Sequence, residues 1–220
     1  MFDTAAGSAS LLFIVGTGLG GMCLGLVADV LVRRALPQLA GDASWRAGIT
    51  TAVGTFVLSA LLAWRFGASA ELPAYALLAV IGTQLARIDL RHHLLPNRLV
   101  LALLSGGLLM LACAAVVLGE SGNLLRGLAG ASTLFLVYLI LALTSRNGLG
   151  MGDVKLAAPL GLYLGYLGWS QLFYGGALGF VAGGLAALSL VLRNRGGKPL
   201  QIAHGPSMLA AALGIILLMP

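Results

Sequence analysis

The sequence predicts an all-helical protein that crosses a membrane several times. Hydrophobic residues make up 59% of the 220 positions and charged residues 9%, whereas about 25% of the residues of an ordinary soluble domain are charged. A chain with so few polar groups cannot cover its surface in water, so we expect it to lie in a bilayer. Its apolar segments approach the length of roughly 20 residues that a helix needs to cross the hydrocarbon core.

Eight apolar segments follow one another, and each is predicted to be a transmembrane helix. In chain order they are residues 11–32, 47–65, 72–90, 97–118, 124–143, 153–168, 170–192 and 204–219. The first has no basic residue before it, unlike a cleavable secretory signal, so we expect it to be retained. The most polar stretch, residues 33–48, is too short for a soluble domain. Residues 1–220 are therefore predicted to form a single membrane-embedded domain.

Positively charged residues indicate the orientation of the chain, because cytoplasmic loops collect Lys and Arg. Eight crossings place 11 of the 13 basic residues on one side of the membrane. These are Arg33, Arg34, Arg46, Arg87, Arg91, Arg98, Arg146, Lys155, Arg193, Arg195 and Lys198. Only Arg65 and Arg126 fall on the other side. The first side is predicted to be cytoplasmic, with both termini outside.

The net charge of +6 follows from this topology and does not indicate a nucleic-acid partner. A nucleic-acid binder needs its basic residues on one folded surface or groove, and these loops are too short to form one. Cys23 and Cys113 lie alone within apolar helices, so neither a disulfide nor a zinc site is expected. His92 and His93 have no Cys or Glu at ligand spacing. No metal or other cofactor is predicted.

Three of the seven acidic residues, Asp29, Asp89 and Asp153, lie inside or at the ends of predicted helices. A charge at membrane depth costs about 2.5–3.5 kcal/mol, so each needs an explanation. Asp89 is near the end of the third helix and Asp153 at the start of the sixth. Two crossings between them return the chain to the same face, which allows both carboxylates to meet at one depth.

A pair of close carboxylates has a chemical use. The two groups do not both ionise cheaply, so the pair holds one proton near neutral pH. One member can then activate water while the other protonates or polarises a carbonyl, which is peptide hydrolysis by an aspartic dyad. Each acid also has a purely structural interpretation. Asp153 would be the N-cap of its helix, and Asp89 would be neutralised by Arg87 or Arg91.

The segment GMGDVKL, residues 150–156, surrounds the second acid. Gly150, Gly152 and Asp153 form the GxGD signature of membrane aspartic proteases, and the longer segment resembles the version found in type IV prepilin peptidases. The glycines either let the backbone approach a substrate strand or form a simple turn. Lys155 belongs to the same motif, and it either favours an ionised Asp153 or extends to the headgroup level.

Two further segments carry the resemblance. Asp89 stands seven residues before Pro96 and Asn97, as the other catalytic acid of that family stands shortly before a Pro-Asn or similar turn. Near the carboxyl end, IAHGPSMLAAALG is similar to the family's Gly-Pro segment that opens the last helix, here Gly205 and Pro206. The segment GLVADVLVRR is a weaker match to the end of the family's first helix.

The resemblance implies an aspartic endopeptidase of the bacterial cytoplasmic membrane with Asp89 and Asp153 as its dyad. Its substrates would be pilin or pseudopilin precursors, cut on the cytoplasmic side between a short basic leader and an apolar helix. Pilus or secretion machinery would be a partner. We expect recognition to depend on the substrate's apolar helix and on local acids such as Asp29 and Asp42. Larger family members carry a zinc-binding loop with two CxxC pairs and also methylate the product. The corresponding loop here has no cysteine, so methyltransferase activity is not predicted.

Two other functional classes remain open from the residues. A small transporter would use Asp89 and Asp153 to bind a cation or carry protons, although transport sites favour the membrane midplane. A non-catalytic assembly protein would keep the fold without the activity. Elsewhere, glycines spaced four apart predict close helix packing. They are Gly16 and Gly20, Gly21 and Gly25, and Gly175, Gly179 and Gly183.

Overall fold

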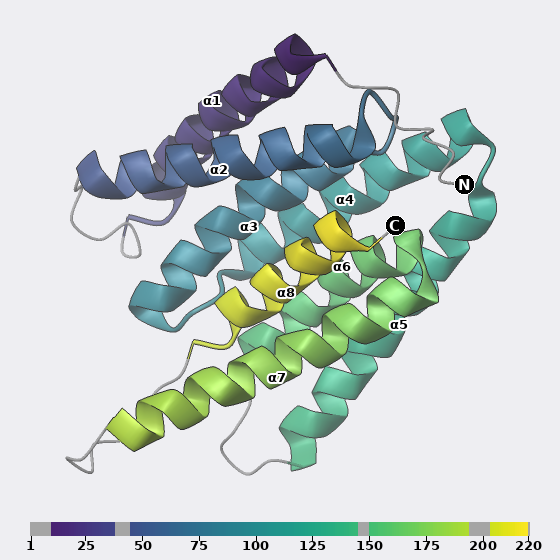
Figure 1. Ribbon diagram of the computed structural model, residues 1–220. Coiled ribbons are helices and arrows are strands. Elements are labelled where there is room, and N and C mark those ends of the chain that lie inside the picture. Colours follow the sequence, from purple (N-terminus) through teal and green to yellow (C-terminus); the bar gives the residue numbers. More distant parts are fainter. Residues whose placement is uncertain (1–9, 38–44, 145–149, 194–202, 220) are drawn as a thin grey trace.

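The computed structural model describes residues 10–37, 45–144, 150–193 and 203–219, and within these ranges the chain forms eight helices and no strand (Figure 1). They are α1 (Leu11–Ala35), α2 (Trp45–Phe66), α3 (Leu72–His92), α4 (Asn97–Leu118), α5 (Ser121–Thr144), α6 (Met151–Leu167), α7 (Trp169–Arg193) and α8 (Gly205–Leu218). The predicted fold class is confirmed. Each observed helix end lies within three residues of its predicted position.

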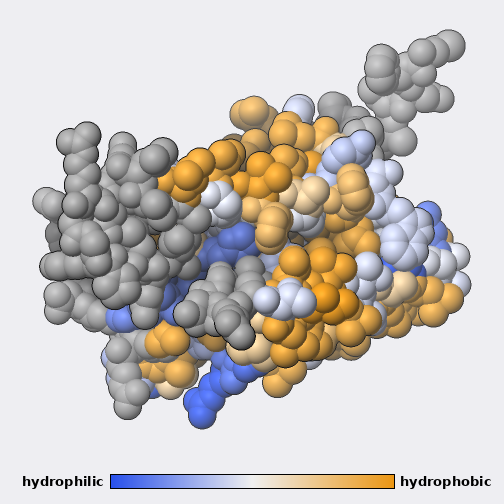
Figure 2. All heavy atoms as spheres, turned by 90° about the horizontal axis from the view of Figure 1, so that it is seen from below, coloured by the Kyte–Doolittle hydropathy of each residue, from blue (hydrophilic) through white to orange (hydrophobic). Residues whose placement is uncertain are grey.

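The outer surface of the bundle is suited to lipid. Four of the described helices are long and apolar enough to cross a membrane, namely α1, residues 48–66 of α2, α4 and α5. Large apolar side chains such as Leu12, Leu109 and Val116 are mostly exposed on these helices. Figure 2 shows apolar residues over much of the lower face, with polar residues confined to smaller areas. So much exposed apolar surface marks a polytopic membrane protein.

Helix α6 is the buried centre of the fold. Twelve of its 17 residues are buried, and α4, α5, α7 and α8 pack around it (Figure 1). At 1.5 Å per residue, a 17-residue helix is only about 26 Å long. Because protein covers α6 on most sides, it does not need the long lipid-facing surface of the outer helices.

Glycines bring the backbones of α5 and α6 into contact. A Cβ atom on Gly130 would lie 2.5 Å from the carbonyl oxygen of Gly161 and 3.0 Å from the Cα of Gly165. Neither helix can carry a side chain at this crossing, as in other close helix pairs of membrane proteins.

The predicted packing roles of the other glycines are confirmed in part. Gly21 and Gly25 of α1 face Ser59 and Thr55 of α2 closely enough to exclude a Cβ atom. On α7, the three predicted glycines face Leu164 of α6, Met208 of α8 and His204, the residue that precedes α8. The prediction is wrong for Gly16 and Gly20, because a Cβ atom on either would have nothing within 4 Å among the described residues.

Candidate active site

A polar cavity lies where four helix ends meet: the carboxyl end of α3 and the amino ends of α4, α6 and α8. Its volume is about 360 Å³. It is lined by Asp89, His93, Leu94, Leu95, Asn97, Gly150, Met151, Gly152, Asp153, Lys155 and His204. The two acids that the sequence placed on one face of the membrane therefore share one cavity, and the geometric part of that prediction is confirmed.

Asp89 is held by one hydrogen bond to its backbone and one to its side chain. It lies in the last turn of α3, and its backbone carbonyl accepts a hydrogen bond of 2.9 Å from the N–H of His93, which caps the helix in the left-handed conformation. Its buried carboxylate accepts a 3.0 Å hydrogen bond from the N–H of Gly205, the first residue of α8. The amino end of a helix is a favourable place for a negative charge.

Gly205 leaves no room for a side chain beside this carboxylate. A Cβ atom there would lie 2.8 Å from Oδ2 of Asp89 and 3.4 Å from Leu95. Pro206 follows in the first turn of α8, where a helix tolerates a residue without an N–H. The Gly-Pro segment that begins α8 thus lies against Asp89, although Gly205 and Asp89 are 116 residues apart in the chain.

Asp153 lies inside the first turn of α6 and not at its cap. The N-cap is Gly150, whose carbonyl accepts a 3.0 Å hydrogen bond from the N–H of Asp153. The interpretation of Asp153 as the N-cap residue is therefore wrong. Its side chain is available to the cavity that it lines, and only 8% of the residue is exposed.

The other motif residues form the walls around the two acids. A Cβ atom on Gly152 would lie 3.1 Å from the Cβ of Leu95, so this glycine lets α6 approach the loop between α3 and α4. Lys155 donates a 3.0 Å hydrogen bond to the side-chain oxygen of Asn97, just after Pro96, the N-cap of α4. This contact ties α6 to α4 at the mouth of the cavity.

Sequence reasoning missed His204 and Tyr138 and considered His93 only as a metal ligand, which it did not predict. His204 lines the cavity directly before Gly205, and its ring centroid lies 6.1 Å from that of Tyr138 and 6.4 Å from that of Phe180. Tyr138 of α5 is buried behind His204. The place of His204 beside the Gly-Pro motif was the available signal, whereas nothing in the sequence distinguishes Tyr138.

Asp29 is part of a separate ion-pair network between α1 and α3. Its carboxylate pairs with Arg33 at 2.7 Å and with Arg87, and Arg87 also donates to Thr51 of α2. Two arginines already pair with this acid, so its expected part in recognising the substrate stays a prediction. The other acid named for that role, Asp42, lies outside the described residues.

The described basic residues separate toward two ends of the bundle. Arg33, Arg91, Arg98 and Lys155, for example, lie at the helix ends nearest the cavity. At the opposite end, Arg65 donates to the carbonyl of Met219, and Arg126 donates to carbonyls in the last turn of α6 and at its end. Three other residues predicted for the cavity side, Arg146, Arg195 and Lys198, lie outside the described part of the chain.

Among the described residues, no group of three or more His, Cys, Asp or Glu side chains is placed to hold a metal ion. Cys23 and Cys113 are both free. The polar groups of the cavity are therefore two carboxylates, two imidazoles, an amide and an ammonium group.

The fold and the site define a polytopic helical membrane protein with a pair of acids in one cavity at the end of its bundle. The chain belongs to the type IV leader peptidase family, which it matches over residues 75–188. Both acids lie within the matched region.

Curated relatives cover most of the chain. It is 34% identical over 195 residues to the Prepilin leader peptidase/N-methyltransferase of Aeromonas hydrophila, an alignment that spans 88% of this chain and 61% of the relative. It is 36% identical over 188 residues to the protein of the same name from Dickeya chrysanthemi, which covers 80% of this chain and 62% of the relative. The chain thus spans about 60% of the length of these relatives. No solved structure matches it.

Proposed function

We propose that this protein is an aspartic endopeptidase that removes the leader from type IV pilin-like precursors, with Asp89 and Asp153 as its catalytic dyad. The observation that carries the proposal is the shared cavity, which both carboxylates line at one end of the bundle. Membership of the type IV leader peptidase family and the similarity to prepilin leader peptidases support it.

The two carboxylates line one cavity, and the mechanism needs one of them charged and the other protonated. Asp89 accepts a hydrogen bond from the Gly205 N–H, an interaction that stabilises a carboxylate. Asp89 therefore serves as the base that takes a proton from water, while Asp153 gives its proton to the carbonyl oxygen of the scissile bond. The water oxygen bonds to the carbonyl carbon. The C–N bond then breaks as Asp89 passes its proton to the leaving nitrogen and Asp153 recovers its own.

The cavity end of the bundle faces the cytoplasm of a bacterial cell in this proposal. The basic residues that lie at this end of the helices support the orientation, because Lys and Arg collect on the cytoplasmic side. Pilus or secretion machinery would then receive the processed product. Product methylation is not part of the proposal, since residues 36–44 contain no cysteine.

The position of the acids favours a peptidase over a transporter. Asp89 is three residues from the end of α3, and Asp153 is two residues from the start of α6. A cation site for transport is expected near the midplane, between broken helices. A cleavage site beside the head of a substrate's apolar helix is expected at the boundary, where this cavity lies.

The test is to co-express the protein with candidate pilin precursors and to follow the gel mobility of the precursor. Asp89→Asn and Asp153→Asn are each expected to abolish cleavage, and the double variant should be little worse than either single one, because the pair acts as a unit. Glu120→Gln, an exposed acid at the opposite end of the bundle, should leave cleavage at the parental rate. Cleavage by Asp153→Asn at nearly the parental rate would rule out the aspartic mechanism.

A further inference from the structure

An apolar groove runs along the outer surface between α5 and α7. It has a volume of about 520 Å³, and its lining extends from Thr133 to Leu141 on α5 and from Trp169 to Val181 on α7. Leu134 and Leu172 form its buried floor. We call it the α5–α7 groove. The side chains at its rim are open to the surrounding lipid, since Val137, Phe173 and Phe180 are 45%, 70% and 49% exposed.

The α5–α7 groove reaches the wall of the catalytic cavity. Tyr138 and Phe180 line the groove, and both of their rings contact His204, which lines the cavity. Asp153 lines the same cavity as His204. One wall of aromatic side chains therefore separates the apolar groove from the proposed dyad. A peptide that left the groove past this wall would enter the cavity that Asp89 and Asp153 line.

The length of the groove suits part of a helix. Its α7 wall covers 12 residue steps, from Trp169 to Val181, or about 18 Å at 1.5 Å per residue. That distance is a little over three helical turns, and it is more than half of the roughly 30 Å hydrocarbon core. A helix docked in a groove uses side chains at positions i, i+3, i+4 and i+7, which this length accommodates.

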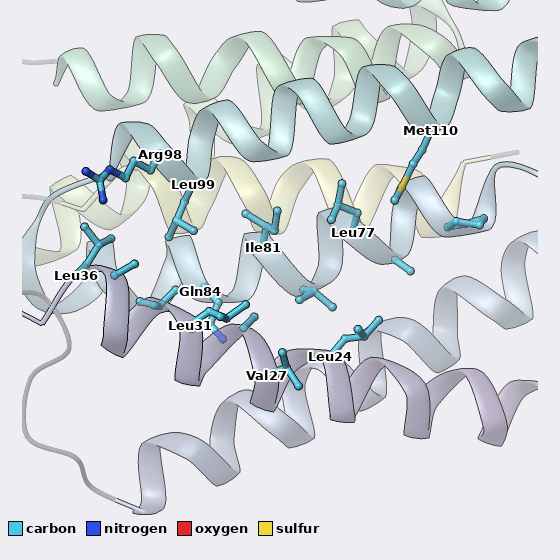
Figure 3. Close-up of a pocket in the computed structure, with 16 residues that line it drawn as sticks. Leu24, Val27, Leu31, Leu36, Leu77, Ile81, Gln84, Arg98, Leu99 and Met110 are labelled. Carbon is cyan, nitrogen blue, oxygen red and sulfur yellow. The ribbon is translucent and has the colours of Figure 1, made fainter.

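A second apolar groove of about 540 Å³ lies between α1, α3 and α4 (Figure 3), but it is a poorer candidate. Arg98 and Leu36 lie at one end of it, so it presents a positive charge near the mouth through which a basic leader would pass. Gln84 on its floor donates to the carbonyl of Gly25 on α1, whereas Asp89 faces α8. Helix α3 therefore stands between this groove and the dyad.

We propose that the α5–α7 groove docks the apolar helix of the membrane-anchored precursor, and that the wall formed by Tyr138, Phe180 and His204 guides the preceding peptide bond to Asp89 and Asp153. This docking site rests on the proposed function. It assigns substrate recognition to the intramembrane helix of the precursor and cleavage to the polar cavity.

Two alanines of α7 provide a matched test. Ala177 lines the groove and Ala182 does not, yet both are exposed on the same helix. Ala177→Trp fills the groove and should raise the KM for a full-length prepilin about tenfold, the size expected when a well-packed contact is lost. The KM for a soluble peptide that contains the leader and the cut bond but no apolar helix should not change. Ala182→Trp and Ala28→Trp, which fills the second groove, should leave both values unchanged.

The outcomes separate docking from catalysis. Equal KM values for Ala177→Trp and Ala182→Trp on full-length prepilin would show that only lipid occupies the groove, and they would overturn the docking proposal. A raised KM for Ala28→Trp alone would also overturn it. An equal rise in KM for Ala177→Trp on both substrates would do the same. If Asp153→Asn also abolishes cleavage in these experiments, the proposed function stands even where docking fails. If Asp153→Asn cleaves both substrates normally, the proposed function itself is overturned.

Discussion

The contact between Gly205 and Asp89 is the residue-scale feature on which the site depends most directly. The N–H of Gly205 holds the carboxylate, and the missing side chain gives that carboxylate its space. Gly205→Ala should therefore displace Asp89 and reduce the rate of prepilin cleavage at least about tenfold, as small misplacements of catalytic groups do. Cleavage kinetics of the purified variant in detergent measure this effect.

The matched control lies on the same helix. A Cβ atom on Gly214 has nothing within 4 Å among the described residues, so Gly214→Ala should keep the parental rate. Unchanged cleavage by Gly205→Ala would mean that the position of the Asp89 carboxylate is not important for catalysis.

Asp29 has a structural role at the same scale. Removing its charge leaves Arg33 and Arg87 without their carboxylate partner in a largely buried region. Breaking a buried ion pair costs about 3–5 kcal/mol, so Asp29→Asn should lower the midpoint of thermal unfolding in detergent. Glu120→Gln removes an exposed acid and should leave the unfolding midpoint unchanged. An Asp29→Asn protein that unfolds at the parental temperature would show that this network contributes little to stability.

Some residues of the site were predictable from the sequence and others were not. The two acids stood out because a charge inside an apolar segment needs a reason, and the GxGD and Gly-Pro motifs singled out their neighbours. Lys155 and Asn97 were named separately, but their hydrogen bond was not foreseen, because the two residues are 58 positions apart and lie on different helices. Tyr138 could not be found, since one tyrosine in an apolar helix has no local pattern.

At the scale of the helices, the crossing of α5 and α6 is the most demanding contact. Gly130→Ala would place a Cβ atom against the backbone of Gly161, which cannot move aside as a flexible side chain can. We expect this variant to accumulate poorly or to unfold at a clearly lower temperature, because overpacking typically costs about 1–3 kcal/mol. The amount of folded protein in detergent and its unfolding midpoint are the measurements.

Gly122, near the start of the same helix, provides the comparison for this crossing. A Cβ atom there meets nothing within 4 Å in the described part of the chain. Gly122→Ala should be neutral or slightly stabilising, since alanine favours a helix over glycine by up to about 1 kcal/mol. Equal stability of the two variants would mean that the backbones at the crossing separate easily.

Helix positions were predictable for a simple reason, whereas the central place of α6 was not. Polar residues and glycines bound each apolar run, and these mark where a helix can end. However, lipid is as apolar as a protein core, so hydropathy does not distinguish a helix that faces lipid from one that faces protein. Only the short length of α6, 17 residues, hinted that other helices surround it.

At the scale of the whole molecule, the number of crossings determines whether Asp89 and Asp153 can meet. The carboxyl end of α3 and the amino end of α6 meet in one cavity, which requires α4 and α5 to carry the chain across and back. The loop at Leu94 and the turn at Glu120 should therefore lie on opposite sides of the membrane. Both positions are exposed, so a cysteine at either should be accessible to a label from water.

This topology can be measured in a protein whose Cys23 and Cys113 are replaced by alanine. With a membrane-impermeant maleimide, Glu120→Cys should react in intact spheroplasts, and Leu94→Cys only in inverted membrane vesicles. The expected sides follow from the basic residues at the cavity end, which collect in the cytoplasm. Labelling of both cysteines from the same side would mean that α4 does not cross the membrane. Labelling with the sides exchanged would keep the fold but place the cavity outside, where a cytoplasmic leader could not reach the two acids.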